Sequence, residues 1–211
     1  MKVIGFNGSA RKEGNTSILI RKVFDELEDE GIETKLVNLG PQSVNGCLAC
    51  GKCMENKDGH CIQKKDALND WLDVMAAADG IILGSPVYFA NISGQIKCFM
   101  DRAWMVARAN GNLFRRKVGA AVVSARRAGC VSTFHALNNY FTIAEMVVVG
   151  SSYWNMGFGR VKGEAVQDGE GMQIMSNLGK NMAWLMKSIE ASKTSVLPPE
   201  TSLDVVTNFI R

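Results

Sequence analysis

A chain of 211 residues is long enough for one domain with a sizeable core, and its hydrophobic fraction of 46% and charged fraction of 21% are ordinary for a globular protein. The net charge of +3 is too small to indicate nucleic-acid binding, and no apolar run approaches the roughly 18 residues of a membrane span. The strand-like start has no signal-peptide shape, so we expect a cytoplasmic protein whose six cysteines are ligands or free thiols rather than disulfides.

The first stretch of the chain predicts a strand, a polar loop and a helix. An apolar run at 3–6 indicates the strand, and an amphipathic segment at 16–30 indicates the helix. The intervening loop reads N-G-S-A-R-K-E-G-N and is rich in glycine and polar groups. A helix N-terminus binds anions because its first backbone N–H groups are unpaired and its dipole is positive there. Ser9, Arg11 and Thr16 are suitable donors to a phosphate monoester.

Two well-known phosphate loops do not match this stretch. A dinucleotide fingerprint needs G-x-G-x-x-G and an acidic residue after the next strand, but Gly5 and Gly8 are three apart and the second strand ends in Val-Asn-Leu. A Walker A loop needs Gly-Lys-Ser/Thr, but Gly14 is followed by Asn15. The stretch therefore predicts either an anion site of another class or an ordinary polar turn before a helix.

The rest of the chain alternates strands with helices. Such alternation predicts a three-layer, doubly wound α/β fold, and the right-handed crossover rule favours five parallel strands in the order 2-1-3-4-5. Ligands then bind at the carboxyl ends of the first and third strands, where the order reverses. We expect one domain over 1–192 and a tail over 193–211 that packs on the domain or on a neighbouring subunit. The expected strands are 33–39, 80–84, 118–123 and 146–150, and the expected helices are 66–78, 94–109, 131–141 and 169–191.

The loop after the third strand is apolar and aromatic, with the sequence G-S-P-V-Y-F-A-N-I-S-G from Gly84. It suits the wall of a pocket for a flat ring. An anion cradle and a stacking surface at one crevice fit FMN, which has one phosphate and one planar ring system. The alternative is that Val87, Tyr88 and Phe89 are simply core residues.

Both loops resemble those of the flavodoxin-like NAD(P)H-dependent FMN reductases. The first matches their N-G-S-x-R-x-x-G-N-T loop, and residues 85–102 match S-P-x-Y…S-G-x-x-K-x-F-x-D-R. The resemblance covers about 1–150 and implies a flavodoxin-like fold with an FMN cofactor that carries the chemistry, so no catalytic side chain is expected. The loop at 124–129 lacks the glycine-rich run usual in this family. The residues implied to bind FMN are Ser9, Arg11, Gly14, Asn15, Thr16, Pro86, Val87, Tyr88, Phe89, Asn91 and Ser124.

Four cysteines in the cysteine-rich loop at 40–62 form the array C-x2-C-x2-C-x7-C. Three thiolates spaced by two residues can converge on one cluster, and a distant fourth closes the site. Zinc fits less well, because structural zinc sites usually pair two C-x2-C knuckles over a longer interval. The array is similar to that of the iron–sulfur flavoproteins, which implies a [4Fe–4S] cluster held by Cys47, Cys50, Cys53 and Cys61. The alternative is a cysteine-rich loop without a cluster, as in some FMN reductase relatives.

These resemblances imply an FMN-dependent oxidoreductase that passes electrons between a [4Fe–4S] cluster, FMN and an acceptor. The acceptor would be a redox partner or a small molecule. One alternative is an NAD(P)H-dependent FMN or quinone reductase without a cluster, and another is a flavin-based redox sensor. The resemblance also implies a homodimer or homotetramer, in which Lys97, Asp101 and Arg102 hold their helix and the subunit contacts.

Overall fold

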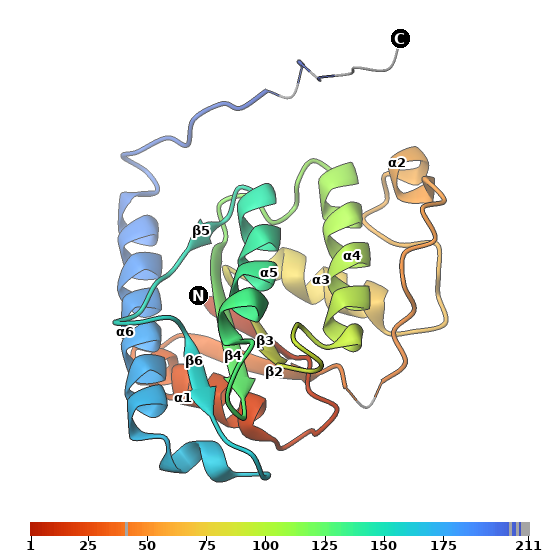
Figure 1. The fold of residues 1–211 in the computed structure, drawn as a ribbon. Helices are drawn as coiled ribbons and strands as arrows, with labels where there is room; N and C mark the ends of the chain where they lie inside the picture. Colours follow the sequence, from red (N-terminus) through yellow and green to blue (C-terminus); the bar gives the residue numbers. More distant parts are fainter. Residues whose placement is uncertain (41, 203, 206, 208–211) are drawn as a thin grey trace.

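A parallel sheet forms the centre of this computed structural model, which describes residues 1–40, 42–202, 204–205 and 207 (Figure 1). The strand order β2-β1-β3-β4-β5 confirms the predicted flavodoxin-like topology. The last position is split, because β5 pairs with the start of β4 and β6 pairs with its end. The strands are Lys2–Asn7 (β1), Glu33–Asn38 (β2), Gly80–Pro86 (β3), Val118–Ala125 (β4), Val147–Val148 (β5) and Met156–Phe158 (β6).

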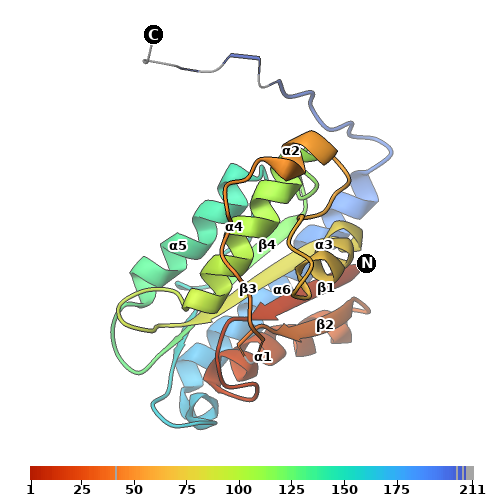
Figure 2. The same ribbon diagram turned by 90° about the vertical axis from the view of Figure 1, so that its right-hand side faces the viewer.

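Two helical layers cover the sheet, as Figures 1 and 2 show. Helices α1 and α6 share one hydrophobic core with one face of the strands, whereas α3, α4 and α5 share a second core with the other face. Among the described residues, no helix is apolar over the length that crossing a bilayer requires. The helices are Asn15–Asp29 (α1), Lys52–Asn56 (α2), Leu68–Ala77 (α3), Gly94–Ala109 (α4), Cys130–Ile143 (α5) and Gly169–Ser192 (α6), with a 3-10 helix at Glu164–Gln167 (η1).

The central strands are buried on both faces, which explains their continuous apolar runs. Every residue of β3 and β4 is buried. Successive side chains of a strand point to opposite faces, so Ile81 and Leu83 pack into the core beneath α3, α4 and α5, and Ile82 packs into the core beneath α1 and α6. The sheet thus holds both helical layers in fixed positions.

Two short elements were missed by the sequence patterns. The strand predicted at 146–150 is shorter in the structure, where it comprises only Val147–Val148 (β5). A second short strand, β6, follows after a loop and was not predicted. The cysteine-rich loop contains α2, which has five residues and none of them buried. Elements this short carry too few residues to show a hydrophobic period.

The C-terminal tail leaves the domain after α6 and extends from it in Figure 1. Val196 and Leu197 are exposed, while the Pro199 carbonyl accepts a hydrogen bond from Arg116 and the Thr201 hydroxyl donates to Glu145 at 3.2 Å. Positions 203, 206 and 208–211 of the predicted tail lie outside the described residues. The packing of the tail on the domain or on a neighbouring subunit stays a prediction.

Phe99 is the central ring of an aromatic cluster in the core beneath α3 and α4. It is fully buried, with its ring centroid 4.4 Å from that of Phe6 and 5.8 Å from that of Trp71. We expect Phe99→Ala to lower the free energy of unfolding by about 3–5 kcal/mol, because it removes apolar contacts and leaves a cavity. Denaturant unfolding measures this loss. Trp184→Ala is the control, since that ring is 70% exposed; an equal loss in both variants would contradict the expectation.

Candidate functional site

The reversal of the strand order brings the loops after β1 and β3 together. Strand β1 pairs in parallel with both β2 and β3. The Gly8 N–H donates to the Gly84 carbonyl at 2.8 Å, and the Ser93 hydroxyl donates to the Gly8 carbonyl at 2.6 Å. A Cβ on Gly8 would lie 2.8 Å from Cβ of Ile96, so this approach requires glycine. The two predicted binding loops are therefore locked side by side.

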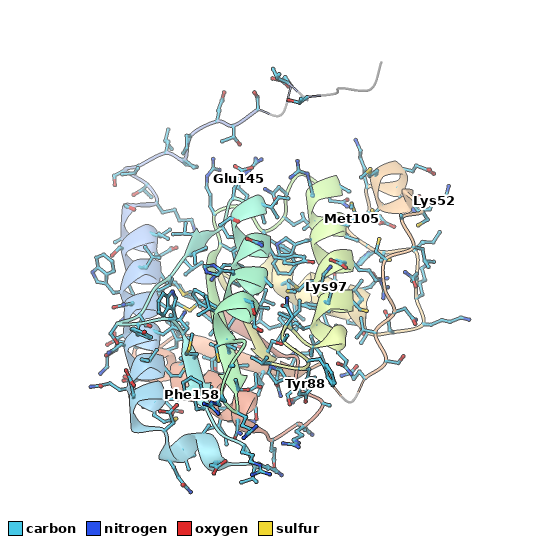
Figure 3. All side chains as sticks on the ribbon, in the orientation of Figure 1. Lys52, Tyr88, Lys97, Met105, Glu145 and Phe158 are labelled. Atoms are coloured by element: carbon cyan, nitrogen blue, oxygen red, sulfur yellow. The ribbon has the colours of Figure 1, made fainter. Side chains whose placement is uncertain are left out.

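A cavity of about 200 Å³ opens where these loops meet. Figure 3 shows Tyr88 and Phe158 at this end of the molecule, away from Glu145 at the other end. Of the residues predicted to bind FMN, Gly14, Phe89 and Asn91 do not line the cavity. The lining residues are Ser9, Arg11, Asn15, Thr16, Pro86, Val87, Tyr88, Ser124, Ala125, Arg126, Gly159 and Arg160, so the other predicted positions are brought together here.

Polar side chains in the cavity wall are held by hydrogen bonds. The Thr16 and Ser124 hydroxyl oxygens lie 2.6 Å apart and share one hydrogen bond. The Asn15 amide donates to the Val161 carbonyl at 3.0 Å and accepts from the Ala165 N–H at 3.2 Å. Asn15 therefore fastens the loop after β6 to the start of α1, and its amide is already occupied by these bonds.

The first turn of α1 contributes Asn15 and Thr16 to the cavity wall. Gly14 is the N-cap, and within the described chain no side chain caps this turn. The Ser9 hydroxyl does not accept a hydrogen bond from this turn, because it accepts one from the Arg11 N–H at 3.1 Å. A helix start with unpaired N–H groups and a nearby hydroxyl is the arrangement that binds phosphate oxygens.

The cavity is strongly cationic. Arg11, Arg126 and Arg160 all line it, and no acidic side chain is among the described residues of its wall. This charge favours an anionic ligand. Arg160 was missed by the sequence analysis, because it follows the three-residue strand β6 and no motif marks it.

The tip of the β3 loop is a tight hairpin turn with an unusual backbone. The Tyr88 N–H donates to the Asn91 carbonyl at 2.9 Å, and the Asn91 N–H donates back at 3.3 Å. Between them Phe89 and Ala90 have φ values of 43° and 76°, the left-handed region that normally favours Asn-Gly. The turn leaves the Phe89 ring fully exposed and outside the cavity wall. The family resemblance implies that this ring contacts the flavin.

A second cavity, of about 320 Å³, lies beside α4, and its wall includes all four cysteines of the array. Burial raises the pKa of the Cys53 thiol, and the neighbouring Cys47 and Cys61 raise it further. Across the described residues, no three His, Cys, Asp or Glu side chains converge as a single-ion site would need. Apart from the thiols the wall is mostly apolar, with Leu48, Ala49, Gly51, Met54, Ile62, Gln63, Arg102, Met105 and Val106 as its other residues.

The two cavities lie at different positions along α4. The helix begins at Gly94, after the aromatic loop that contributes Pro86, Val87 and Tyr88 to the first cavity, which we call the flavin-type cavity. Its C-terminal half contacts the second cavity, the cysteine cavity, through Arg102, Met105 and Val106. Figure 2 shows the loop with α2 alongside this half, and Figure 3 places Met105 and Lys52 on the same side. At 1.5 Å per helical residue, the cysteine cavity lies roughly 12–18 Å along the axis from the start of α4.

Sequence comparisons find relatives that match most of the chain. The family model described as NADPH-dependent FMN reductase matches residues 1–160. An iron–sulfur flavoprotein of Methanocaldococcus jannaschii is 40% identical over 197 residues, covering 90% of this chain and 100% of that protein. An iron–sulfur flavoprotein of Methanosarcina thermophila is 33% identical over 196 residues, covering 92% of this chain and 99% of that protein.

Solved structures share the fold at low sequence identity. RosB with bound 8-demethyl-8-formylriboflavin-5'-phosphate has a TM-score of 0.73 at 16% identity, covering 100% of this chain and 94% of RosB. A flavodoxin from the domain Archaea has a TM-score of 0.59 at 16% identity, covering 89% of this chain and 99% of that flavodoxin. From the family match and the curated relatives, the chain belongs to the NADPH-dependent FMN reductase family and is a flavin-dependent oxidoreductase.

The left-handed backbone of Ala90 gives a testable prediction. The left-handed conformation costs a residue with a Cβ about 1–2 kcal/mol of conformational free energy. Glycine avoids this cost but loses more backbone entropy on folding. We expect Ala90→Gly to raise the free energy of unfolding by about 0.5–1 kcal/mol in a denaturant titration. The exposed loop residue Ala128, which lies outside the left-handed region, is the control, since glycine there should destabilise slightly. Destabilisation by Ala90→Gly would contradict this account of the turn.

Proposed function

We propose that this member of the NADPH-dependent FMN reductase family is an electron-transfer protein of the iron–sulfur flavoprotein type. Electrons would pass between a [4Fe–4S] cluster, FMN and an acceptor, which is a redox partner or a small molecule. The observation that carries the proposal is the pair of cavities in one chain: a cationic pocket at the strand ends, and a pocket whose wall holds all four cysteines of the array. The curated relatives named iron–sulfur flavoproteins support it.

The residues of the first cavity fit FMN. Its phosphate would bind the first turn of α1 together with Ser9, Arg11 and Thr16, because helix N–H groups, hydroxyls and a guanidinium all donate to phosphate. Its ring would lie against Pro86, Val87 and Tyr88, and its polar chain near the Ser124 hydroxyl, Arg126 and Arg160. When bound, FMN supplies the redox chemistry, since it accepts two electrons together and releases them singly. The chain binds and orients it. The predicted FMN-binding positions that lie outside the cavity wall are Gly14, which caps α1, and Phe89 and Asn91, which form the hairpin turn.

The residues of the second cavity fit an iron–sulfur cluster. Cys47, Cys50, Cys53 and Cys61 would hold it, since all of them face one cavity. A cubane spreads its thiolate ligands over separate corners, so its ligands do not converge as those of a single zinc ion do. When bound, the cluster supplies one-electron transfer at a potential set by charge, hydrogen bonds and solvent exposure. The apolar wall around Met105 and Val106 limits that exposure.

An NAD(P)H-dependent FMN or quinone reductase is the second candidate function. The name of the matching family and the additional guanidinium groups of Arg126 and Arg160 favour it. Those cations can serve the phosphates of a nicotinamide dinucleotide as well as that of FMN. NAD(P)H would then be the donor, with or without a cluster.

We propose that the chain assembles as a homodimer or homotetramer. Met105 and Ile143 are exposed apolar side chains beside a groove of about 200 Å³ between α4 and α5, and the tail carries further exposed apolar residues.

The phosphate cradle gives a binding prediction. Arg11→Ala should remove a hydrogen bond to a charged group worth about 1.5–3 kcal/mol, and so weaken FMN binding roughly 10-fold to 150-fold. Flavin fluorescence titration of the flavin-free protein measures the dissociation constant. Lys12→Ala is the matched control, because Lys12 is the neighbouring exposed cation and lies outside the cavity wall. Equal FMN affinity in Arg11→Ala and the wild type would contradict the assignment.

The cluster ligands give a second prediction. Cys50→Ser should lose iron and acid-labile sulfide while keeping the wild-type circular dichroism spectrum, because Cys50 is exposed and belongs to no buried core. Cys98→Ser is the control, since Cys98 lies on α4 outside the cavity wall. Full iron content in Cys50→Ser would exclude it as a ligand.

The tail gives the oligomer prediction. A chain ending at residue 192 should elute later than the full chain on gel filtration by more than its lost mass explains, because the tail would stabilise contacts between subunits. Light scattering on the eluted peak gives the mass directly. An unchanged oligomer would show that the tail has no part in assembly.

A further inference from the structure

Arg102 is a buried cation on α4 that the function described above does not use. Its side chain has 0% exposure, and it lines the cysteine cavity. The resemblance to the FMN reductases implies that it holds its helix and contacts between subunits, and this stays a prediction. In the structure it reaches both ends of the cysteine-rich segment of its own chain, where one Nη donates to the Asn45 carbonyl at 3.3 Å and the other to the Gln63 carbonyl at 3.1 Å.

These two carbonyls flank the whole array. Asn45 precedes the first cysteine, and Gln63 follows the last. The Gln63 side chain adds a third link between the two ends, since its amide donates to the Gly46 carbonyl at 3.0 Å. One planar guanidinium thus closes the loop at the base of the segment that carries all four thiols, which a flexible ammonium could not do with the same geometry.

The same guanidinium forms a buried ion pair with Asp66. The Nη to carboxylate distance is 2.5 Å, and the Asp66 side chain is 4% exposed. Burial alone would raise the pKa of Asp66, but the hydrogen bond and charge of Arg102 and the Asn45 N–H lower it, so the carboxylate stays ionised.

Only one member of the ion pair belongs to the wall of the cysteine cavity. Arg102 lines the cavity together with the four cysteines, whereas Asp66 is not among the lining residues. The Nε of Arg102 is buried and lacks a partner among the described residues. A buried N–H donor without a hydrogen-bond partner, close to a group of thiols, fits a site that binds a negatively charged group.

We propose that Arg102 is the positioning residue of the cysteine cavity: it closes the loop that holds the four thiols and turns a buried positive charge toward the group they bind. The proposal rests on the cluster assignment above. A cluster with four thiolate ligands carries net negative charge, and its potential depends on that charge and on nearby hydrogen bonds. Arg102 therefore favours both the retention and the reduction of the cluster.

The loop-closing role is tested on cluster-free protein by hydrogen–deuterium exchange of peptides from 46–62. Arg102→Lys keeps the charge but cannot span both carbonyls and the carboxylate, so we expect exchange in this segment to rise at least tenfold while the strands keep their protection. The control is Lys97→Met, which removes an exposed cation from the same helix. Wild-type exchange in Arg102→Lys would overturn the proposal.

The charge role is tested on anaerobically reconstituted protein by redox titration of the cluster signal in electron paramagnetic resonance. Arg102→Gln should shift the midpoint potential to a more negative value, and Asp66→Asn, which leaves the guanidinium uncompensated, to a more positive one. Shifts in the same direction, or none in either variant, would overturn the charge role. A wild-type protein without iron would refute the cluster assignment itself, and the exchange comparison would still decide whether Arg102 closes the loop.

Discussion

The close contact between the loop after β1 and the end of β3 determines the flavin-type site. The hydrogen bonds from the Gly8 N–H to Gly84 and from the Ser93 hydroxyl to Gly8 leave no room for a side chain at position 8. They fix the start of α1, the aromatic loop and the start of α4 relative to one another. Because Ser93 also accepts the Ile96 N–H at 3.4 Å as the N-cap of α4, one hydroxyl joins the phosphate-type loop to that helix. The lining residues from the start of α1 and from the aromatic loop are thus held in place before any ligand arrives, which lowers the entropy lost on binding.

Helix α4 links the two cavities physically. Its N-cap, Ser93, is hydrogen-bonded to Gly8 beside the flavin-type cavity, and two turns later Arg102 hydrogen-bonds both ends of the cysteine-rich loop. The loop itself has little core of its own, since Cys47 and Cys50 are exposed and α2 buries no residue. Its shape therefore depends on the buried ion pair and on hydrogen bonds to neighbouring elements, among them those of Asn69 with Cys61 and of Asn110 with Gly59.

The sequence allowed the sheet order and many of the residues that line the flavin-type cavity to be predicted, because both follow from patterns within short segments. The loops after β1 and β3 carry their polar and aromatic residues at consecutive positions. The outward turn of Phe89 was not predictable, because the pair Phe-Ala does not signal a turn with positive φ values. Arg160 and Arg102 were missed as site residues for a different reason. Each reaches its cavity through tertiary contacts with segments far away in sequence, and no local pattern records such contacts.

The most direct test is an absorption spectrum with iron and acid-labile sulfide analysis of the protein purified without oxygen. Air can destroy such clusters, so the anaerobic preparation is essential. The account predicts flavin bands on a broad iron–sulfur background, with about four irons and four sulfides per flavin, as a cubane cluster requires. Flavin bands with neither iron nor sulfide would contradict the electron-transfer function and leave an FMN reductase whose cysteine cavity has another use.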